Sequence, residues 1–327
     1  MKRTLLVFCI LVWAVLGHLS VSAGSGHAQS WPTKPIVFVV PAPAGGGMDI
    51  FARPLAEQLG TQLGMRVLID NRSGAAGTVG ASYVSRAAPD GYTFLIGAAH
   101  HAIAPAIYSK LDYDIEKDFI PIGIIAMVPQ VIVVTPNLPV KSLSEFIEYA
   151  KTKADSLTFG SAGIGTTHHL AGELFKLSTN TRMLHVPYRG AAPAMQDLIA
   201  GHIQVMFDTL GTSTTQITGG AVRALATATQ ERVKGLPDVP TTAEAGLPGF
   251  VMSTWYALWA PKGVPAPIVD RMIAEVKKAL QSPLVETALK RNGSETVFML
   301  GPDFGKFVGS EVVRWRKVAT QANIKAD

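Results

Sequence analysis

The sequence predicts an α/β fold of two lobes, each a mainly parallel sheet flanked by helices, with a ligand cleft between the lobes. Three observations support this prediction. Apolar, β-branched strand segments alternate with helical patterns along the chain. The chain without its leader, about 300 residues, exceeds one ordinary core. Two glycine-rich turns, one in each half of the chain, each join a strand to a helix.

A signal peptide is predicted at the N-terminus, as residues 1–28. A basic tetrapeptide precedes an apolar run at 5–16, and small and polar residues follow up to Ala28. This pattern is typical of a secretory leader, and the run is shorter than the roughly 20 residues of a membrane span. Cleavage is expected after Ala28, with Ala23 as the alternative. Because Cys9 lies in the leader, the exported chain has no cysteine, and we expect it in the periplasm.

Charge and residue content exclude several classes of function. The formal charge of +5 falls to +3 once Lys2 and Arg3 leave with the leader. No cluster of Lys and Arg with interleaved aromatic residues is present, which argues against a nucleic-acid surface. The sequence has no Gly-x-Ser-x-Gly elbow and no zinc-type His/Glu spacing, so we expect no enzyme activity, no metal and no cofactor.

The first lobe is predicted to alternate strands and helices, which implies a parallel sheet. An irregular segment at 108–121 leads into a strand region at 121–136. The earlier elements are strands at 36–40, 66–69 and 92–97 and helices at 49–62 and 78–87.

A second alternation follows, and the chain then returns to the first lobe. Its first helix, at 143–153, has Ser142 as the expected N-cap with Glu145 three residues on. We assign residues 29–130 and 253–327 to the first lobe and 131–252 to the second. The remaining elements are strands at 158–160, 184–186, 204–208, 221–228 and 255–259, and helices at 168–177, 192–200, 267–280, 282–291 and 303–321.

The first glycine-rich turn, residues 44–48, follows the strand at 36–40. The helix after it begins with unpaired N–H donors and a partial positive charge, so the turn suits an anion. It lacks the Lys-Ser/Thr of a phosphate-binding loop, which argues against a nucleotide. Asp49 and Arg53, four apart on the helix, are expected to pair. The candidate ligand-binding residues here are Ala44, Gly45, Gly46, Gly47 and Met48.

The second turn, residues 161–167, repeats this arrangement in the other lobe. Thr166 or Thr167 either donates to a ligand or caps its own helix. The turn does not complete a dinucleotide fingerprint, because His168 stands at the third glycine position. Two such turns predict a clamp that holds a carboxylate from both sides. The candidate ligand-binding residues are Ser161, Gly163, Gly165, Thr166 and Thr167.

Two histidine pairs, His100–His101 and His168–His169, are further candidates. Adjacent residues point to different faces, so a pair rarely gives two ligands to one metal. We expect one member of each pair to line the cleft, and His100 and His101 to be ligand contacts. His100 follows the carboxyl end of a strand, and near neutral pH an imidazole can donate to an anion.

Asp208 and Tyr188 follow strands of the second lobe. Asp208 either caps the turn that follows it or accepts a hydrogen bond from a ligand amine or hydroxyl. Tyr188 and Arg189 are candidates because strand ends in α/β sheets are where ligands dock.

Several motifs together resemble the Bug (TctC-type) solute-binding proteins of tripartite tricarboxylate transporters. They occur in order along the exported chain. They are Trp31-Pro-Thr-Lys-Pro-Ile36, Val39-Val-Pro-Ala-Pro-Ala-Gly-Gly-Gly-Met-Asp-Ile50, Asp70-Asn-Arg-Ser-Gly-Ala-Ala-Gly77, Ala88-Pro-Asp-Gly-Tyr92, Lys117-Asp-Phe-Ile-Pro121, Gly160-Ser-Ala-Gly-Ile-Gly-Thr166, His169-Leu-Ala-Gly-Glu-Leu-Phe175, His185-Val-Pro-Tyr-Arg-Gly190, Met206-Phe-Asp208, Leu236-Pro-Asp-Val-Pro-Thr241 and Glu244-Ala-Gly-Leu-Pro-Gly249.

The resemblance implies a type II-like, two-lobed periplasmic binding protein that closes on a small carboxylate: a di- or tricarboxylate, an aromatic acid or an acidic amino acid. Both turns would grip one carboxylate, and His100, His101, Tyr188 and Asp208 would contact the far end of the ligand. The implied partners are the large and small permease subunits, with the receptor as a monomer. Two alternatives stay open at this point, a subunit that presents the ligand to a signalling receptor and a periplasmic hydrolase.

Overall fold

The structure is a computed structural model that describes residues 31–153, 156–294 and 296–326. The predicted signal peptide, residues 1–28, lies outside these described residues. Residues 34–327 form one unit with its own core. Within the described ranges, no helix has the combined length and apolarity that crossing a membrane requires.

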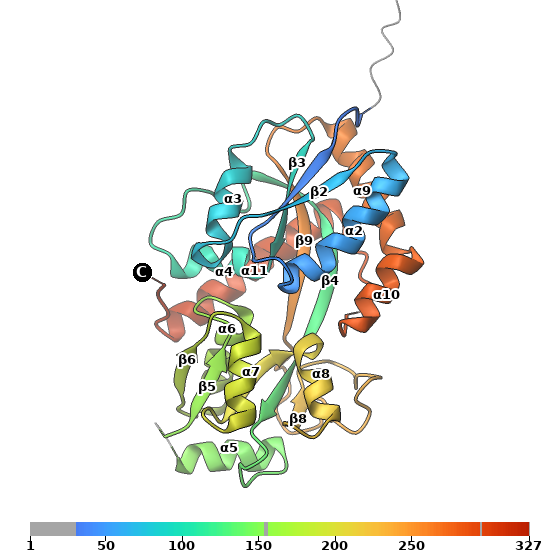
Figure 1. Cartoon of the computed structure of the whole chain (residues 1–327). Helices are drawn as coiled ribbons and strands as arrows, with labels where there is room; N and C mark the ends of the chain where they lie inside the picture. Colours follow the sequence, from blue (N-terminus) through green and yellow to red (C-terminus); the bar gives the residue numbers. More distant parts are fainter. Residues whose placement is uncertain (1–30, 154–155, 295, 327) are drawn as a thin grey trace, which may run out of the picture. The chain divides into compact units, whose positions relative to one another are not determined.

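Three parallel strands form the first part of the sheet (Figure 1). Strand β1 (Ile36–Val40) lies between β2 (Val67–Asn71) and β3 (Thr93–Ala98) and is parallel to both. All three match predicted strands to within two residues at each end. The alternation of strand and helix in the sequence therefore predicted this part of the sheet correctly.

The helices beside these strands include one that the sequence did not predict. The first helix, α2 (Gly47–Leu63), and α3 (Thr78–Ser85) were expected, and a short 3-10 turn, η1 (Ala75–Gly77), precedes α3. The predicted elements include no helix between 97 and 108, but α4 (His100–Ile107) lies there. Pro105 and the two histidines have low helix propensity, so this helix was not predicted from the sequence. It forms because its alanine and isoleucine side chains are buried against the core.

Two long antiparallel strands connect both parts of the sheet. Along β4 (Phe119–Val134), the residues up to Pro129 pair with β9 (Ser253–Pro261), which in turn pairs with β3. From Gln130 onward β4 pairs with β7 (Val205–Thr209) and β8 (Arg223–Thr227). One strand therefore belongs to both halves of the two-lobed fold. The predicted lobe boundaries stay a prediction.

In the second part of the sheet β5 (Thr158–Ser161) lies between β6 (Leu184–Pro187) and β7 and is parallel to both. Ser142 accepts a hydrogen bond from the Glu145 amide, as the capping pattern predicted. A turn was expected after Asp208, but a helix at residues 210–218 begins two residues later. The many Thr and Ser residues of this helix lower its helix propensity, which explains why it was not predicted. The helices of this part are α5 (Leu143–Thr152), α6 (Thr167–Thr179), α7 (Ala191–Ala200) and the unpredicted α8 (Leu210–Thr218).

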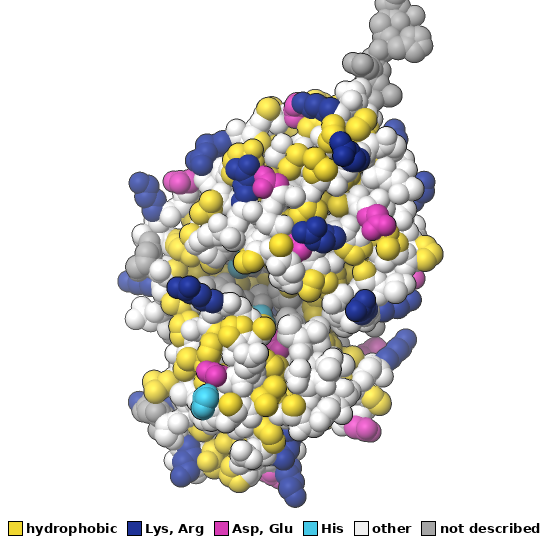
Figure 2. All heavy atoms as spheres, in the orientation of Figure 1, with side chains coloured by type: hydrophobic (Ala, Val, Ile, Leu, Met, Phe, Trp, Pro, Cys, Tyr) yellow, Lys and Arg dark blue, Asp and Glu magenta, His cyan; other side chains and the backbone are white. Residues whose placement is uncertain are grey.

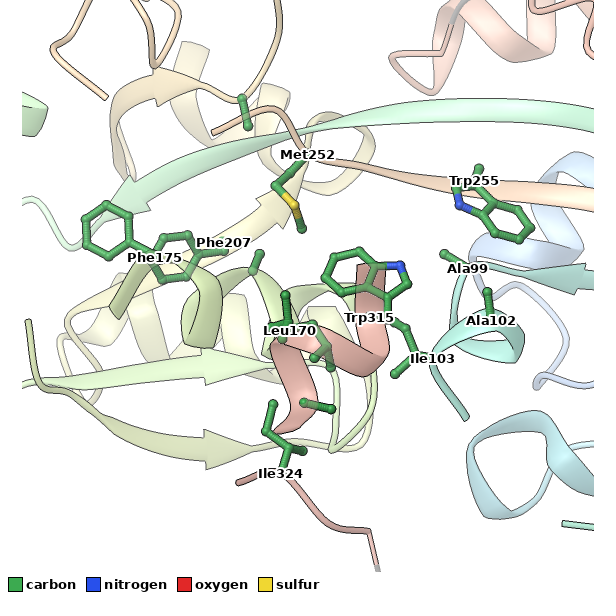
Figure 3. Packing of buried hydrophobic residues seen from close by; sticks show 14 of the residues in the cluster. Ala99, Ala102, Ile103, Leu170, Phe175, Phe207, Met252, Trp255, Trp315 and Ile324 are labelled. Carbon is green, nitrogen blue, oxygen red and sulfur yellow. The ribbon is translucent and has the colours of Figure 1, made fainter. Parts of the chain in front are cut away.

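The C-terminal helix α11 (Gly301–Gln321) packs against both parts of the fold. It contacts α4 and β4 on one side and α6 on the other. Figure 3 shows Trp315 of α11 among Leu170 of α6, Ile103 of α4 and Met252. The two other closing helices are α9 (Ala266–Leu280) and α10 (Pro283–Arg291), both close to their predicted positions.

A buried carboxylate fixes α11 to β9. Glu311 is 6% exposed, and its Oε2 accepts hydrogen bonds from the indole N–H groups of Trp255 (3.1 Å) and Trp315 (3.0 Å). Arg314 donates to Oε1 at 3.4 Å and to the Val251 carbonyl at 3.0 Å. Because β9 enters the first part of the sheet at this point, Glu311 fixes the path of the returning chain.

Replacing Glu311 with Ala should lower the free energy of unfolding by about 2–4 kcal/mol, because two buried indole N–H groups lose their acceptor. Glu311→Gln keeps an acceptor and should cost clearly less. Urea unfolding followed by tryptophan fluorescence measures both. Glu148→Ala removes an exposed helix pair with Lys151 and serves as the control. Equal losses for Glu311→Ala and Glu148→Ala would contradict the assigned role.

Candidate functional site

The buried carboxylate of Asp49 holds the first turn, residues 44–48, in place. Asp49 is 2% exposed, and its oxygens accept from the Gly45 amide (2.8 Å), the Arg53 guanidinium (2.7 and 3.0 Å) and the Asn71 amide (3.0 Å). The predicted Asp49–Arg53 pair is therefore confirmed. Burial raises the pKa of Asp49, but Arg53, Gly45 and Asn71 outweigh this and leave it below its usual value. The turn is thus fixed to the end of β2.

This network determines which backbone donors of the first turn are free. The Gly45 amide donates to Asp49, and the Gly46 amide donates to the Pro43 carbonyl at 3.1 Å. The amides of Gly47 and Met48, the first two residues of α2, have no protein acceptor among the described residues. At a helix start such N–H groups suit an anion. Of the predicted turn residues, Gly47 and Met48 are the ones placed to donate.

Tyr256 of β9 lies directly against this turn. A Cβ atom added at Gly47 would overlap the Tyr256 hydroxyl oxygen. The Tyr256 ring packs 5.1 Å from that of Phe51. Burial and the nearby charge of Asp208 both raise the pKa of Tyr256. The phenol is therefore neutral, and it lies within electrostatic range of a carboxylate from the other part of the fold.

The second turn is held by an internal hydroxyl. Ser161 is fully buried; its Oγ lies 2.6 Å from His185 Nε2, accepts from the Gly163 amide (3.1 Å) and donates to the Gly163 carbonyl (3.2 Å). Thr166 caps α6, since it accepts from the His169 amide and donates to the Gly163 carbonyl at 2.7 Å. These two hydroxyls therefore stabilise the conformation of the turn. Thr166 caps its own helix, one of the two roles that the sequence left open for it.

A stacked pair of imidazoles lies behind the turn. His169 Nδ1 accepts from the Gly165 amide at 3.3 Å, and its ring stacks on His185 with centroids 3.9 Å apart. Burial, with the Lys176 charge, lowers the pKa of His169 to about 4; burial, His169 and Lys176 lower that of His185 to about 3. Both rings are therefore neutral near pH 7. The Thr167 and His168 amides, the first two of α6, have no protein acceptor in the described ranges.

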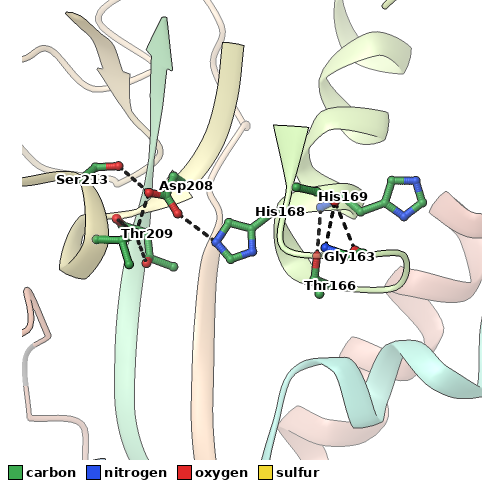
Figure 4. A network of polar contacts seen from close by, with 9 residues as sticks. Gly163, Thr166, His168, His169, Asp208, Thr209 and Ser213 are labelled. Atoms are coloured by element: carbon green, nitrogen blue, oxygen red, sulfur yellow. Dashed lines mark hydrogen bonds and ion pairs between the residues drawn. The ribbon is translucent and has the colours of Figure 1, made fainter. Parts of the chain in front are cut away.

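Asp208 and His168 form a buried pair (Figure 4). His168 Nε2 lies 3.0 Å from Asp208 Oδ1, and the Thr212 and Ser213 hydroxyls donate to Oδ2 at 2.6 Å each. Burial raises the pKa of Asp208, but His168, Ser213 and Thr212 outweigh this and keep it low. Asp208 therefore binds two side-chain hydroxyls of α8 but does not cap its backbone, because the N-cap residue of α8 is Thr209. Any effect it has on a ligand acts through His168.

The remaining predicted residues are less accessible than expected. His101 is fully buried, and its Nδ1 accepts from the Ala98 amide at 3.1 Å. The His100 ring packs against it at a tilt, with centroids 4.1 Å apart, and burial lowers the pKa of both, for His101 to about 4. The Tyr188 hydroxyl donates to Asp197 at 2.6 Å. His100 is the partly exposed member of its pair, whereas His168 and His169 are both buried.

The two turns are linked by a continuous series of contacts. Tyr256 lies against Gly47 and within range of the Asp208 charge, and Asp208 holds His168 at the start of α6. A Cβ atom added at Gly165 would overlap Ile107 of α4, so the second turn also contacts the first part of the fold. Figure 2 shows a hollow between the two parts, with histidine atoms at its floor. The two helix starts are therefore connected through Tyr256, Asp208 and His168.

Comparison with known proteins identifies the family. Residues 51–324 match the tripartite tricarboxylate transporter family receptor, TctC. This chain belongs to that family. A relative from Pseudomonas sp. strain P51, a UPF0065 protein from the tcbD–tcbE intergenic region, is 36% identical over 97% of this chain and 95% of its own. Protein BugT of Bordetella pertussis is 33% identical over 95% and 97%.

Solved structures show the same two-lobed fold for this TctC-family receptor. The periplasmic binding protein BugD has 36% identity and a TM-score of 0.81, covering 90% of this chain and 99% of its own. R. palustris Rpa4515, solved with adipate, has 38% identity and a TM-score of 0.83 with the same coverage. MatC from Rhodopseudomonas palustris, with bound malate, has 34% identity and a TM-score of 0.80, covering 88% and 99%. The chain is therefore a solute-binding protein of the TctC/Bug type.

Sequence reasoning missed three features of this receptor's site. Tyr256 gave no signal, since its strand reads as a buried core strand. The role of His185 depends on Ser161, 24 residues away. The pairing of His168 with Asp208 joins residues 40 apart. In the described ranges, no group of three His, Cys, Asp or Glu side chains could hold a metal ion. The expectation of no metal and no cofactor stays a prediction.

The free energy of unfolding should fall as the pH drops from about 6.5 towards 4. The unfolded chain protonates its histidines near pH 6.5, whereas burial holds His101 and His169 neutral to about pH 4 and His185 to about 3. The unfolded state therefore binds more protons throughout this window. Urea unfolding at several pH values measures the slope. His185→Gln should reduce this slope by about one proton. A flat profile contradicts the prediction.

Gly47→Ala should lower the free energy of unfolding by about 1–3 kcal/mol, because the new methyl group overlaps the Tyr256 hydroxyl. Adding Tyr256→Phe removes that oxygen and should restore part of the loss. Gly235→Ala, where an added Cβ meets no atom within 4 Å, is the matched control. Chemical denaturation of the four variants, including Tyr256→Phe alone, measures the coupling. Strictly additive effects would show that the two residues do not touch in solution.

Proposed function

We propose that this receptor captures a small organic carboxylate in the periplasm, between the starts of α2 and α6. One observation carries the proposal. The first two amides of each helix have no protein acceptor among the described residues, and the two helices come from different parts of the fold. Four N–H groups match the roughly four lone-pair positions of one carboxylate. Closure of the lobes on the ligand brings the two pairs together.

The charges around the turns support an anion that is held by backbone. Asp49, beneath the first turn, is neutralised by Arg53. Behind the second turn the two stacked imidazoles are neutral. Helix starts bind anions without charged side chains, so the absence of a lysine or arginine from either turn fits a carboxylate. The adipate and malate in the two related structures are both dicarboxylates, which favours a diacid here.

Delivery to a membrane permease completes the proposed role. The family is a transporter receptor family, and we propose that the leader at residues 1–28 exports the chain, which acts as a monomer. Large and small permease subunits are the proposed partners. A sensing role would use the same site, and permease genes beside this one would favour transport over it.

Catalysis is not favoured by the geometry of Ser161. A serine hydroxyl 2.6 Å from a histidine nitrogen resembles a nucleophile and its base. However, Ser161 is fully buried, and its hydroxyl makes two further bonds to Gly163 of its own turn. No described carboxylate hydrogen-bonds to His185 to orient it. The serine and histidine therefore fit a role in shaping the turn, and we propose a receptor without enzyme activity.

Purified receptor, unfolded and refolded to remove any bound ligand, should be stabilised by adipate or malate in a thermal-shift titration. A ligand at 100 times its Kd adds about 2.7 kcal/mol, which raises the Tm by several degrees. Adipamide, which has adipate's length without its charges, is the control and should have no effect. A folded, ligand-free protein that no mono-, di- or aromatic carboxylate stabilises would refute the proposed function.

A further inference from the structure

His168 has one imidazole nitrogen that the protein leaves unused. The residue is 9% exposed and is the second residue of α6, so its backbone amide is one of the four proposed carboxylate donors. Its Nε2 meets Asp208, but its Nδ1 is buried and has no hydrogen-bond partner among the described residues. Figure 4 shows the ring between Asp208 and the turn at Gly163–Thr166. Buried polar atoms normally have a hydrogen-bond partner, so we expect Nδ1 to bind an atom of the ligand.

The Asp208 carboxylate fixes the state of Nε2. Asp208 also accepts from Thr212 and Ser213, so it acts purely as an acceptor and Nε2 must carry a proton. Nδ1 is then an acceptor in the neutral ring and a donor in the protonated ring. Protonation of Nδ1 places a positive charge between Asp208 and whatever group of the ligand it meets.

The four helix amides leave His168 free for a second group of the ligand. They match the acceptor positions of one carboxylate, which therefore needs no imidazole. A second carboxylate near Asp208 would put two anions in a buried region, where their repulsion is strong. A protonated imidazole between them removes that repulsion and donates to the ligand through Nδ1.

The neighbouring groups are unable to supply this charge in place of His168. Lys176 is paired with Glu173 at 2.9 Å, and Arg314 of α11 with Glu311 at 3.4 Å. Tyr256 from β9 is neutral, and α8 offers Thr212 and Ser213, which are uncharged. The other titratable groups facing the site from α6, β6 and α4 are His169, His185, His100 and His101, all kept neutral by burial.

We propose that His168 is a specificity-determining residue, which takes up a proton from solvent at Nδ1 and binds the second carboxylate of a dicarboxylate ligand. This inference rests on the proposed function, because the first carboxylate must occupy the helix amides. In this proposal His168 distinguishes a diacid from a monoacid of equal length, because only the diacid forms the charged hydrogen bond and binds with proton uptake.

Isothermal titration calorimetry with adipate and with hexanoate, which lacks the second carboxylate, tests this proposal. In buffers of different ionisation enthalpy, adipate should bind with uptake of about one proton, and its Kd should rise about tenfold per pH unit on the alkaline side. Hexanoate should bind more weakly and without uptake. His168→Gln, which keeps an amide group near Asp208, should remove the uptake and make the two acids bind about equally.

His202→Gln is the matched control, because His202 also pairs with an aspartate, Asp197, but is exposed. It should bind both acids as the unchanged protein does. Adipate binding without proton uptake, equal uptake with hexanoate, or unchanged discrimination in a folded His168→Gln variant would each overturn the role of His168 while leaving carboxylate capture intact. Failure of both acids to bind the unchanged protein would instead reject the proposed function.

Discussion

The antiparallel pairing of β4 with β9 is the constraint on which the rest of this structure depends. Their ladder runs from Phe119–Pro261 to Pro129–Ser253, and β4 then continues into the second part of the sheet. Every helix start in the site is attached to strands that this pair connects. Glu311 ties α11 to β9 at the same level. The chain passes between the two parts of the sheet where β4 changes partner, between Pro129 and Gln130.

The histidines of the site serve mainly as neutral acceptors. His169 accepts from the Gly165 amide, and His101 from the Ala98 amide. A protonated His169 ring would lose the bond from Gly165, so burial, which keeps this ring neutral, also keeps the turn in place. His168 differs, because its Nε2 meets Asp208 while its Nδ1 has no partner among the described residues. The same residue type therefore supports the turns in one place and has a nitrogen left for the ligand in another.

The sequence predicted the strands, most helices and both turns, because these depend on local patterns. It missed α4 and α8, whose helical state comes from burial rather than from propensity: α4 buries Ala102 and Ile103, and α8 buries Leu210 and Ser213. It also predicted ligand contacts for Ser161 and Thr166, whose hydroxyls are engaged within the turn. Local patterns locate a polar residue but do not reveal its partner, since that partner is far away in the chain.

A grip made of backbone amides explains how related receptors could share one fold and bind different acids. The four proposed donors belong to the backbone of Gly47, Met48, Thr167 and His168, so their chemistry does not change with the side chains. Adipate and malate differ in length and in a hydroxyl group, yet both have a carboxylate that such a grip fits. Discrimination must then come from side chains beyond the amides. In this chain we propose His168 for that task, because its unpartnered Nδ1 belongs to the first turn of α6, next to the proposed amide donors.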